Sequence, residues 1–175
     1  MQLTKVKTYS ILGLQLDLDT IVLSLIYVFS FLIPLVIGHP QLLVGSSINF
    51  LIVFTSLKFG FRKSIPVLLI PSLVATGSGL LFGSATLFLV YLMPFIMISN
   101  GILSFAISKR SNLLGVLGGT FFKVFFLYTI TLILVNTIGL PNVFLSSMGL
   151  LQLYTALIGG MISLIISSNF NKAIR

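Results

Sequence analysis

Long apolar runs divide this chain into segments of similar length, and short polar stretches separate them. A helix needs about 20 mostly apolar residues to cross the hydrocarbon core of a bilayer, and most of the runs approach or exceed that length. The pattern therefore predicts an all-α fold, an integral membrane bundle of six transmembrane helices that forms one domain over residues 1–175. The expected spans cover about residues 20–38, 42–57, 64–82, 84–108, 113–139 and 144–170.

The segment before the first run has a different pattern. Lys5 and Lys7 are followed by Leu14, Leu16 and Leu18, which alternate with polar residues. We expect this segment to lie at the membrane interface, and the pattern leaves its shape open. No cleavable signal peptide is expected, because the first apolar run is too long for one and lacks a small-residue cleavage site after it.

Composition supports a membrane protein and argues against nucleic-acid binding. Hydrophobic residues make up 57% of the chain and charged residues 7%, which leaves no room for a separate soluble domain. The formal charge is +8, yet the basic residues occur in twos and threes between apolar runs and form no continuous basic face. We therefore expect this chain to lie in the lipid bilayer and to bind no nucleic acid.

The positions of the basic residues predict the topology. If the N-terminus is cytoplasmic, every Lys and Arg outside the runs falls on the cytoplasmic side, and the three opposite loops contain neither residue type. This distribution is typical of multi-pass proteins of the cell membrane, and it predicts that both termini are cytoplasmic. The residues concerned are Lys5, Lys7, Lys58, Arg62, Lys63, Lys109, Arg110, Lys172 and Arg175.

One charge interrupts an apolar run. Lys123 lies about ten residues into the run Leu113 to Gly139, which places it roughly 15 Å deep, near the middle of the hydrocarbon core. A lysine at that depth costs roughly 2.5 to 3.5 kcal/mol and is a candidate functional residue that needs a partner. The only acids, Asp17 and Asp19, lie on the N-terminal flank. An anionic partner must therefore come from a ligand or another subunit, unless carbonyl and hydroxyl groups suffice.

Polar side chains gather in the expected outer half of the bundle, between the level of Lys123 and the outer surface. We expect a pocket that opens outward, with Lys123 at its floor holding an anionic group and with amides orienting the solute by hydrogen bonds. The candidate substrate-binding residues are Lys123, Asn49, Asn100, Gln152, Thr155, Gln41, His39 and Tyr91.

Each candidate also has a structural explanation. Lys123 can extend its amine toward the cytoplasmic interface, and amide side chains often join membrane helices by hydrogen bonds. For His39, a solvated turn residue, and for Tyr91, an interfacial anchor, the structural explanation is the stronger one. The last run carries small residues at helical spacing, which predicts close packing of that helix: Ala156, Gly159, Gly160 and Ser163.

Several classes of chemistry are disfavoured. The runs contain no acid, no histidine and no cysteine. We therefore expect that the protein is not an enzyme and has no catalytic residues, no metal site and no cofactor. The chain has no Gly-x-x-x-x-Gly-Lys-Ser/Thr sequence for ATP, and no intramembrane carboxylate for coupling to protons or sodium. A transporter of this kind would have to take its energy from partner proteins.

Six spans in 175 residues, cytoplasmic termini, no ATPase and a polar outer half resemble the substrate-binding subunits, or S components, of energy-coupling factor (ECF) transporters. The resemblance covers Thr20 to about Phe170. It includes the stretches Gly38-His39-Pro40-Gln41, Pro71-Ser72, Pro94-Phe95 with Asn100, and Gln152 to Gly160.

The resemblance implies capture of a vitamin or other micronutrient from outside, followed by tilting of the subunit in the membrane. A transmembrane coupling protein and two cytoplasmic ATPases would supply the energy. Lys123 then predicts a small anionic substrate, a carboxylate or a phosphate. Two alternatives remain: a small anion channel or carrier, and a structural or assembly protein whose Lys123 pairs with an acid on a partner helix.

Overall fold

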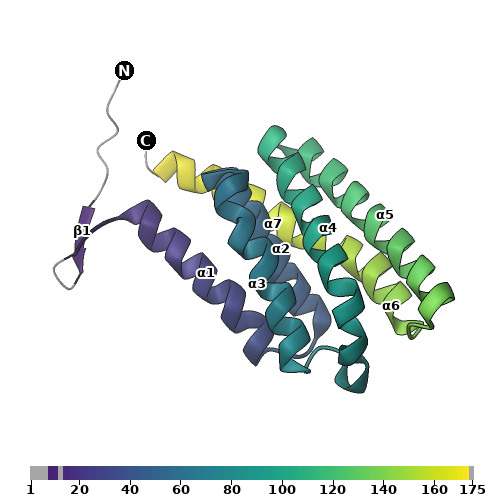
Figure 1. Ribbon diagram of the computed structural model, residues 1–175. Helices are drawn as coiled ribbons and strands as arrows, with labels where there is room; N and C mark the ends of the chain where they lie inside the picture. Colours follow the sequence, from purple (N-terminus) through teal and green to yellow (C-terminus); the bar gives the residue numbers. More distant parts are fainter. Residues whose placement is uncertain (1–7, 12–13, 174–175) are drawn as a thin grey trace.

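The computed structural model describes residues 8–11 and 14–173, and nearly all of this part of the chain is helical (Figure 1). The 3₁₀-helix η1 (Gly83–Phe88) leads into α4, whereas α6 (Val143–Ser146) and the π-helix η2 (Ser147–Leu151) lead into α7. The long helices are α1 (Leu18–Val36), α2 (Gln41–Phe59), α3 (Phe61–Ser78), α4 (Leu89–Lys109), α5 (Leu113–Ile138) and α7 (Gln152–Ala173).

Within the described residues, five helical segments are long and apolar enough to cross a membrane. They are Leu18–Val36, Gln41–Phe59, Ala85–Lys109, Leu113–Ile138 and Val143–Asn169. Helix α3 is the least apolar of the long helices because its 18 residues include Arg62 and Lys63. A helix satisfies its own backbone hydrogen bonds, so several apolar helices of this length are suited to a bilayer. The chain is therefore a multi-pass helical membrane protein.

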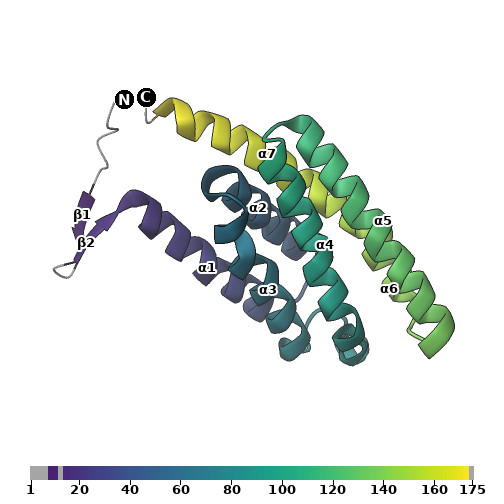
Figure 2. The same ribbon diagram turned by 45° about the horizontal axis from the view of Figure 1, so that its top comes forward.

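Successive long helices run in opposite directions, so that the turns gather at two ends of the bundle (Figures 1 and 2). One end, which we call the uncharged end, holds the turns 37–40, 79–88 and 139–142, which contain no Lys, Arg, Asp or Glu. We call the other the basic end. Lys5, Lys7 and Arg175 lie outside the described residues. The described basic side chains at the basic end are Lys58, Arg62, Lys63, Lys109 and Arg110.

Small residues bring α7 against α2, as the sequence predicted. A Cβ atom added to Gly159 would lie 2.5 Å from both the Phe50 nitrogen and the Ser46 carbonyl oxygen, so the two backbones leave no room for a side chain. Ser163 Oγ donates a hydrogen bond of 2.9 Å to the Phe50 carbonyl oxygen, and Ala156 is fully buried. The prediction of close packing along this helix is confirmed.

The half of the bundle toward the basic end is filled. Apolar side chains from the parts of α2, α4 and α5 nearest that end form one buried cluster that includes Ile52, Val53, Leu103, Ile107 and Val116. Close to them, Ser104 Oγ lies 2.7 Å from Ser56 Oγ and 2.6 Å from Ser64 Oγ, so that hydroxyl groups join α4 to α2 and α3. These five apolar side chains are fully buried, as in a closely packed protein interior.

Before α1, the chain forms a β-hairpin of β1 (Thr8–Ile11) and β2 (Leu14–Asp17), paired antiparallel with Thr8 opposite Asp17. The alternation of apolar and polar residues after Leu14 is typical of a strand, because successive side chains of a strand point to opposite faces. The sequence analysis left the shape of this segment open, and the structure shows these two paired strands before α1.

Two helix boundaries near the uncharged end differ from the expected spans. The third run was expected to continue to residue 82, but α3 ends at Ser78, where Gly79 takes a left-handed φ of 71°. A glycine in this conformation commonly ends a helix, because a residue with a Cβ atom is strained there. The fourth run was expected to be helical from residue 84, and its first residues form the tighter η1 before α4 begins at Leu89.

Candidate functional site

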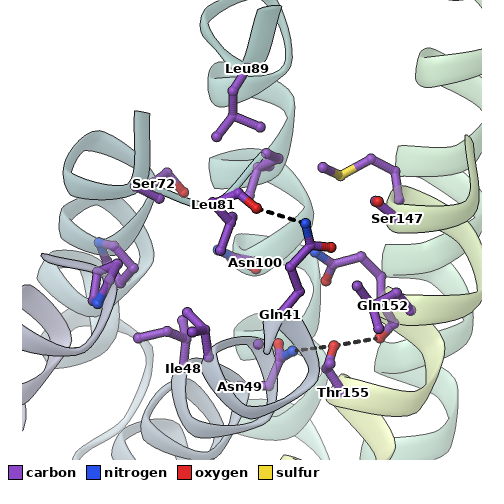
Figure 3. Close-up of a pocket in the computed structure, with 18 of the residues that line it drawn as sticks. Gln41, Ile48, Asn49, Ser72, Leu81, Leu89, Asn100, Ser147, Gln152 and Thr155 are labelled. Atoms are coloured by element: carbon purple, nitrogen blue, oxygen red, sulfur yellow. Dashed lines mark hydrogen bonds between the residues drawn. The ribbon is translucent and has the colours of Figure 1, made fainter. Parts of the chain in front are cut away.

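A cavity of about 100 Å³ lies among α2, α3, α4, α5 and α7, in the half of the bundle toward the uncharged end (Figure 3). In this measure one water molecule needs about 10 to 15 Å³, so the cavity has room for several waters or a small solute. Most of its lining is apolar. The polar side chains that line it are Gln41, Asn49, Ser72, Asn100, Lys123, Ser147, Gln152 and Thr155.

Lys123 lies at the floor of this cavity, and its side chain is 1% exposed. Its Nζ donates hydrogen bonds to Asn49 Oδ1 at 2.5 Å and to Asn100 Oδ1 at 2.8 Å. Both amide oxygens face the amine because an ammonium group is a donor only. Asn49 then directs its Nδ2 away from Lys123 and donates to Thr155 Oγ1 at 3.1 Å. The network thus links α5 to α2, α4 and α7.

The position of each residue in its helix explains why the three side chains meet. Asn49 and Lys123 each lie ten residues, and Asn100 nine residues, from the ends of α2, α5 and α4 at the basic end. At a rise of about 1.5 Å per residue, all three are at nearly the same level, roughly 15 Å from that end. The turns of the chain therefore bring them together from positions far apart in the sequence.

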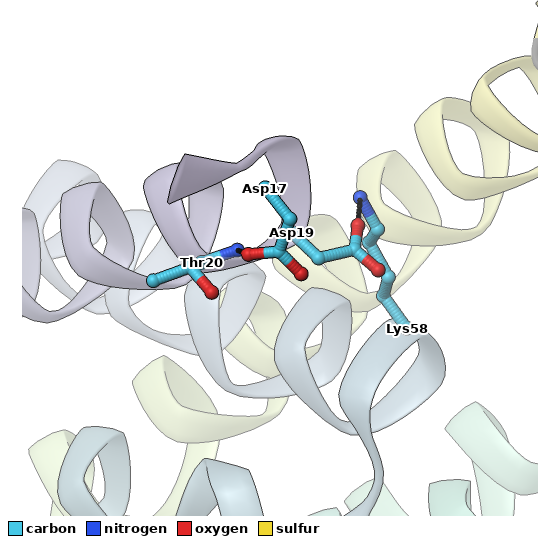
Figure 4. Close-up of polar contacts among 4 residues, drawn as sticks. All are labelled: Asp17, Asp19, Thr20 and Lys58. Atoms are coloured by element: carbon cyan, nitrogen blue, oxygen red, sulfur yellow. Dashed lines mark hydrogen bonds and ion pairs between the residues drawn. The ribbon is translucent and has the colours of Figure 1, made fainter. Parts of the chain in front are cut away.

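Both acids of the sequence lie at the basic end (Figure 4). Asp17 Oδ1 accepts a hydrogen bond of 3.1 Å from the Thr20 backbone nitrogen at the start of α1. Hydrogen bonding with the Thr20 side chain, and then with its backbone nitrogen, holds the pKa of Asp17 below its usual value. Asp19 forms a 2.9 Å ion pair with Lys58. Neither carboxylate lines the cavity, so Lys123 has no acidic partner within the described part of the chain.

Other polar groups around the cavity lack partners. Gln152 Oε1 is buried and accepts no hydrogen bond. Asn100 uses its Oδ1 for Lys123, and within residues 8–11 and 14–173 its Nδ2 has no partner, nor have the hydroxyl groups of Ser72 and Ser147. Lys123 itself makes two of the three hydrogen bonds that an ammonium group can donate. Because buried polar groups are normally paired, these groups are suited to a bound polar molecule.

Gln41 has a different task at the uncharged end of the cavity. Its Nε2 donates a hydrogen bond of 2.8 Å to the Leu81 carbonyl oxygen, which ties the start of α2 to the loop between α3 and η1 (Figure 3). Leu81 and the adjacent Phe82 also line the cavity. This hydrogen bond therefore holds the loop after α3 against the start of α2 at the wall of the cavity.

The structure brings six of the eight predicted site residues to one cavity, and two lie elsewhere. His39 is exposed in the turn before α2, and Tyr91 is 55% exposed on α4, so neither lines the cavity. The prediction did not include Ser72 or Ser147, which do line it. Serine is common in membrane helices and nothing in the spacing of these two distinguishes them, so the sequence held no clear signal for them.

The donor set of the cavity is one amine, several amides and several hydroxyl groups. Among the described residues, no group of three or more His, Cys, Asp or Glu side chains could hold a metal ion. These groups are suited to an anion or a polar organic molecule. Comparison with protein-family models, with curated proteins and with solved structures finds no match.

Proposed function

We propose that this protein captures a small anionic solute from outside the cell and acts as the substrate-binding subunit of an ECF-type uptake transporter. The observation that carries the proposal is the buried amine of Lys123, which lines a cavity, contacts two amide oxygens and meets no carboxylate of the described chain. An unpaired cation at this depth is costly. An anionic solute that enters the cavity supplies the missing charge.

The topology that we propose has six membrane spans, with the basic end in the cytoplasm. Lys and Arg are concentrated on the cytoplasmic side of membrane proteins, and the basic end carries such residues whereas the turns at the uncharged end have none. Helix α3 is the sixth span, with Arg62 and Lys63 at its cytoplasmic end and its apolar part packed among α1, α2 and α4. In this orientation the cavity lies on the outer side of Lys123.

Two observations favour solute capture over the alternatives. A channel needs a polar path through the whole bundle, but the apolar cluster around Ile52, Leu103 and Val116 fills the half toward the basic end. An assembly role needs an acid on a partner helix to reach Lys123, but this side chain is enclosed by α2, α4, α5 and α7 of its own chain. A cavity closed toward the cytoplasm is suited to a subunit that captures its solute from the outer side.

The test of solute capture compares small molecules that copurify with the wild-type protein and with two lysine variants. Lys123→Met removes the charge and keeps a side chain of similar length, whereas Lys109→Met removes an exposed lysine of the basic end. We expect mass spectrometry to detect the same anion with the wild type and with Lys109→Met, and to find it lost with Lys123→Met. Retention by Lys123→Met, or absence of any anion from the wild type, would contradict the proposal.

The energy source is tested separately. The sequence has no ATP-binding motif of its own, so the proposal requires a transmembrane coupling protein and two cytoplasmic ATPases as partners. We expect these three partners to copurify with the protein from its native membrane under mild detergent. Copurification with a single protein that has an acidic membrane helix would instead favour an assembly role.

A further inference from the structure

The charge of the cavity limits the charge of its solute. Lys123 is the one charged side chain among the described residues that line it. A solute with a single negative charge therefore neutralises the site, whereas a second negative charge would remain uncompensated in surroundings of low polarity. The cost of this second charge excludes dicarboxylates as solutes of the cavity. It also disfavours phosphate monoesters, which carry a charge of about −1.5 to −2 at neutral pH.

The free donors at the floor match a carboxylate. Lys123 has one N–H that neither Asn49 nor Asn100 accepts, and Asn100 Nδ2 has no partner among residues 8–11 and 14–173. Both groups belong to the same hydrogen-bonded pair, because Asn100 Oδ1 lies 2.8 Å from Lys123 Nζ. Two adjacent donors can bind the two oxygens of one carboxylate, while a phosphate group has a third terminal oxygen to satisfy.

One buried acceptor on the wall requires a donor from the solute. Gln152 Oε1 is buried without a hydrogen bond, and Gln152 lies three residues before Thr155, which accepts from Asn49. A hydroxyl or a neutral N–H of the solute can satisfy this oxygen. An ammonium group cannot do so at low cost, because the described lining has no acid and already contains the charge of Lys123.

The remaining walls are apolar. They include the side chains of Val44, Ile48, Leu89, Ile96, Met148 and Leu151. We infer that the solute is a compact monocarboxylate with an apolar carbon frame and one uncharged hydrogen-bond donor, bound with its carboxylate against Lys123 and Asn100 and with its donor toward Gln152. This inference rests on the proposed function, because it specifies the class of anion that the cavity captures.

Matched probes test this class on the purified full-length protein. The probes with an aromatic carbon frame are benzoate as the parent acid, 3- and 4-hydroxybenzoate as hydroxy acids, 4-(aminomethyl)benzoate as the zwitterion, terephthalate as the dicarboxylate and phenyl phosphate. The probes with an aliphatic frame are 3-methylbutanoate as the parent acid and 3-hydroxy-3-methylbutanoate as the hydroxy acid. Binding is measured by isothermal titration calorimetry in detergent. In at least one frame, we expect a hydroxy acid to bind about fivefold more tightly than its parent acid, which is the effect of one neutral hydrogen bond. The zwitterion, the dicarboxylate and the phosphate should bind at least tenfold more weakly than that hydroxy acid.

A variant of Gln152 provides the internal control. In Gln152→Leu we expect the advantage of the hydroxy acid over the parent acid to disappear, and measurable binding of the parent acid by the variant shows that the variant is folded. Equal binding of hydroxy acid and parent acid by the wild type, tight binding of the zwitterion, or no binding of any monocarboxylate would overturn the inference.

Failure of this inference can be distinguished from failure of the proposed function. If mass spectrometry detects a phosphate ester or a dicarboxylate that copurifies with the protein and is lost with Lys123→Met, anion capture stands and the monocarboxylate class is wrong. If the retained molecules and the affinities for all probes are the same in the wild type and in Lys123→Met, both proposals are wrong.

Discussion

Asn49→Asp gives Lys123 an acidic partner without changing the shape of the site. The carboxylate is nearly the same size as the amide, and the oxygen it replaces already lies 2.5 Å from Lys123 Nζ. Thr155 now accepts a hydrogen bond from Asn49 and donates one of 3.2 Å to the Gln152 carbonyl oxygen. Its hydroxyl group can rotate away from that carbonyl oxygen and donate to the new carboxylate. The substitution therefore places a permanent counter-charge where the proposed solute supplies a temporary one.

The expected effect on binding is large. At 2.5 Å, opposite unit charges attract by about 7 kcal/mol at an effective dielectric constant of about 20, and desolvation of the carboxylate offsets several kcal/mol of this. A bound carboxylate on the other side of the amine would lie about 5 Å from the new one. Their repulsion is about 3 kcal/mol on the same scale, so affinity for the solute should fall roughly 200-fold. The ligand-free protein should become slightly more stable.

Two measurements and one control test this reasoning. Calorimetry with the tightest-binding carboxylate probe gives the affinity, and thermal unfolding in detergent gives the stability of the ligand-free protein. Asn142→Asp makes the same chemical change in an exposed turn and should alter neither quantity. If Asn49→Asp is folded and binds the probe with the affinity of the wild type, Lys123 does not hold the anion and the reasoning is refuted.

Three further predictions concern other parts of the chain. Gly159→Ala should lower the free energy of unfolding by about 1 to 3 kcal/mol because its Cβ atom would collide with the α2 backbone, whereas Gly118→Ala, with open space around it, should be neutral or stabilising in the same unfolding assay. Gln41→Leu removes the hydrogen bond to the loop after α3, so association and dissociation of a bound probe should both become faster in stopped-flow experiments while the ratio of the rates changes little. The pKa of Asp17 is lowered from 3.8, so protection of the Thr20 amide against hydrogen exchange, relative to its intrinsic rate at each pH, should persist above that pH and be lost as the pH falls through the lowered value. In Asp17→Ala this protection should be lower throughout the pH range.

The helical architecture was largely predictable from the sequence, and the physical reason is the bilayer. Apolar runs of sufficient length become helices there, and the charges between some of them mark the turns at one end of the bundle. Local backbone geometry was less predictable. Strand β1, with the sequence Thr-Tyr-Ser-Ile, is only four residues long, so its alternation is a weak signal. The early end of α3 depends on the conformation of one glycine, Gly79, among several in that region.

The level of the site residues along their helices was predictable from the sequence, but the direction in which each side chain points was not. Counting residues along the helices places Lys123, Asn49 and Asn100 at one level, because the rise per residue is constant. The rotation of each helix about its axis is not encoded in the same way, since the sides that face lipid and the sides that face the core are both apolar. Tyr91 illustrates this limit, because it lies on α4 in the half of the bundle toward the uncharged end, as the cavity does, but is exposed and does not line the cavity.

The π-helix η2 has a consequence for how this helix tolerates insertions and deletions. A π-helical turn accommodates one more residue than an α-helical turn, and each residue of an α-helix turns the chain by about 100°. Deletion of a single residue within Ser147–Leu151 would therefore let this turn become α-helical, with α6 and α7 keeping nearly their present orientation. The deletion would instead change the side that Ser147 and Met148, inside the turn, present to the cavity, while Gln152 stays in place.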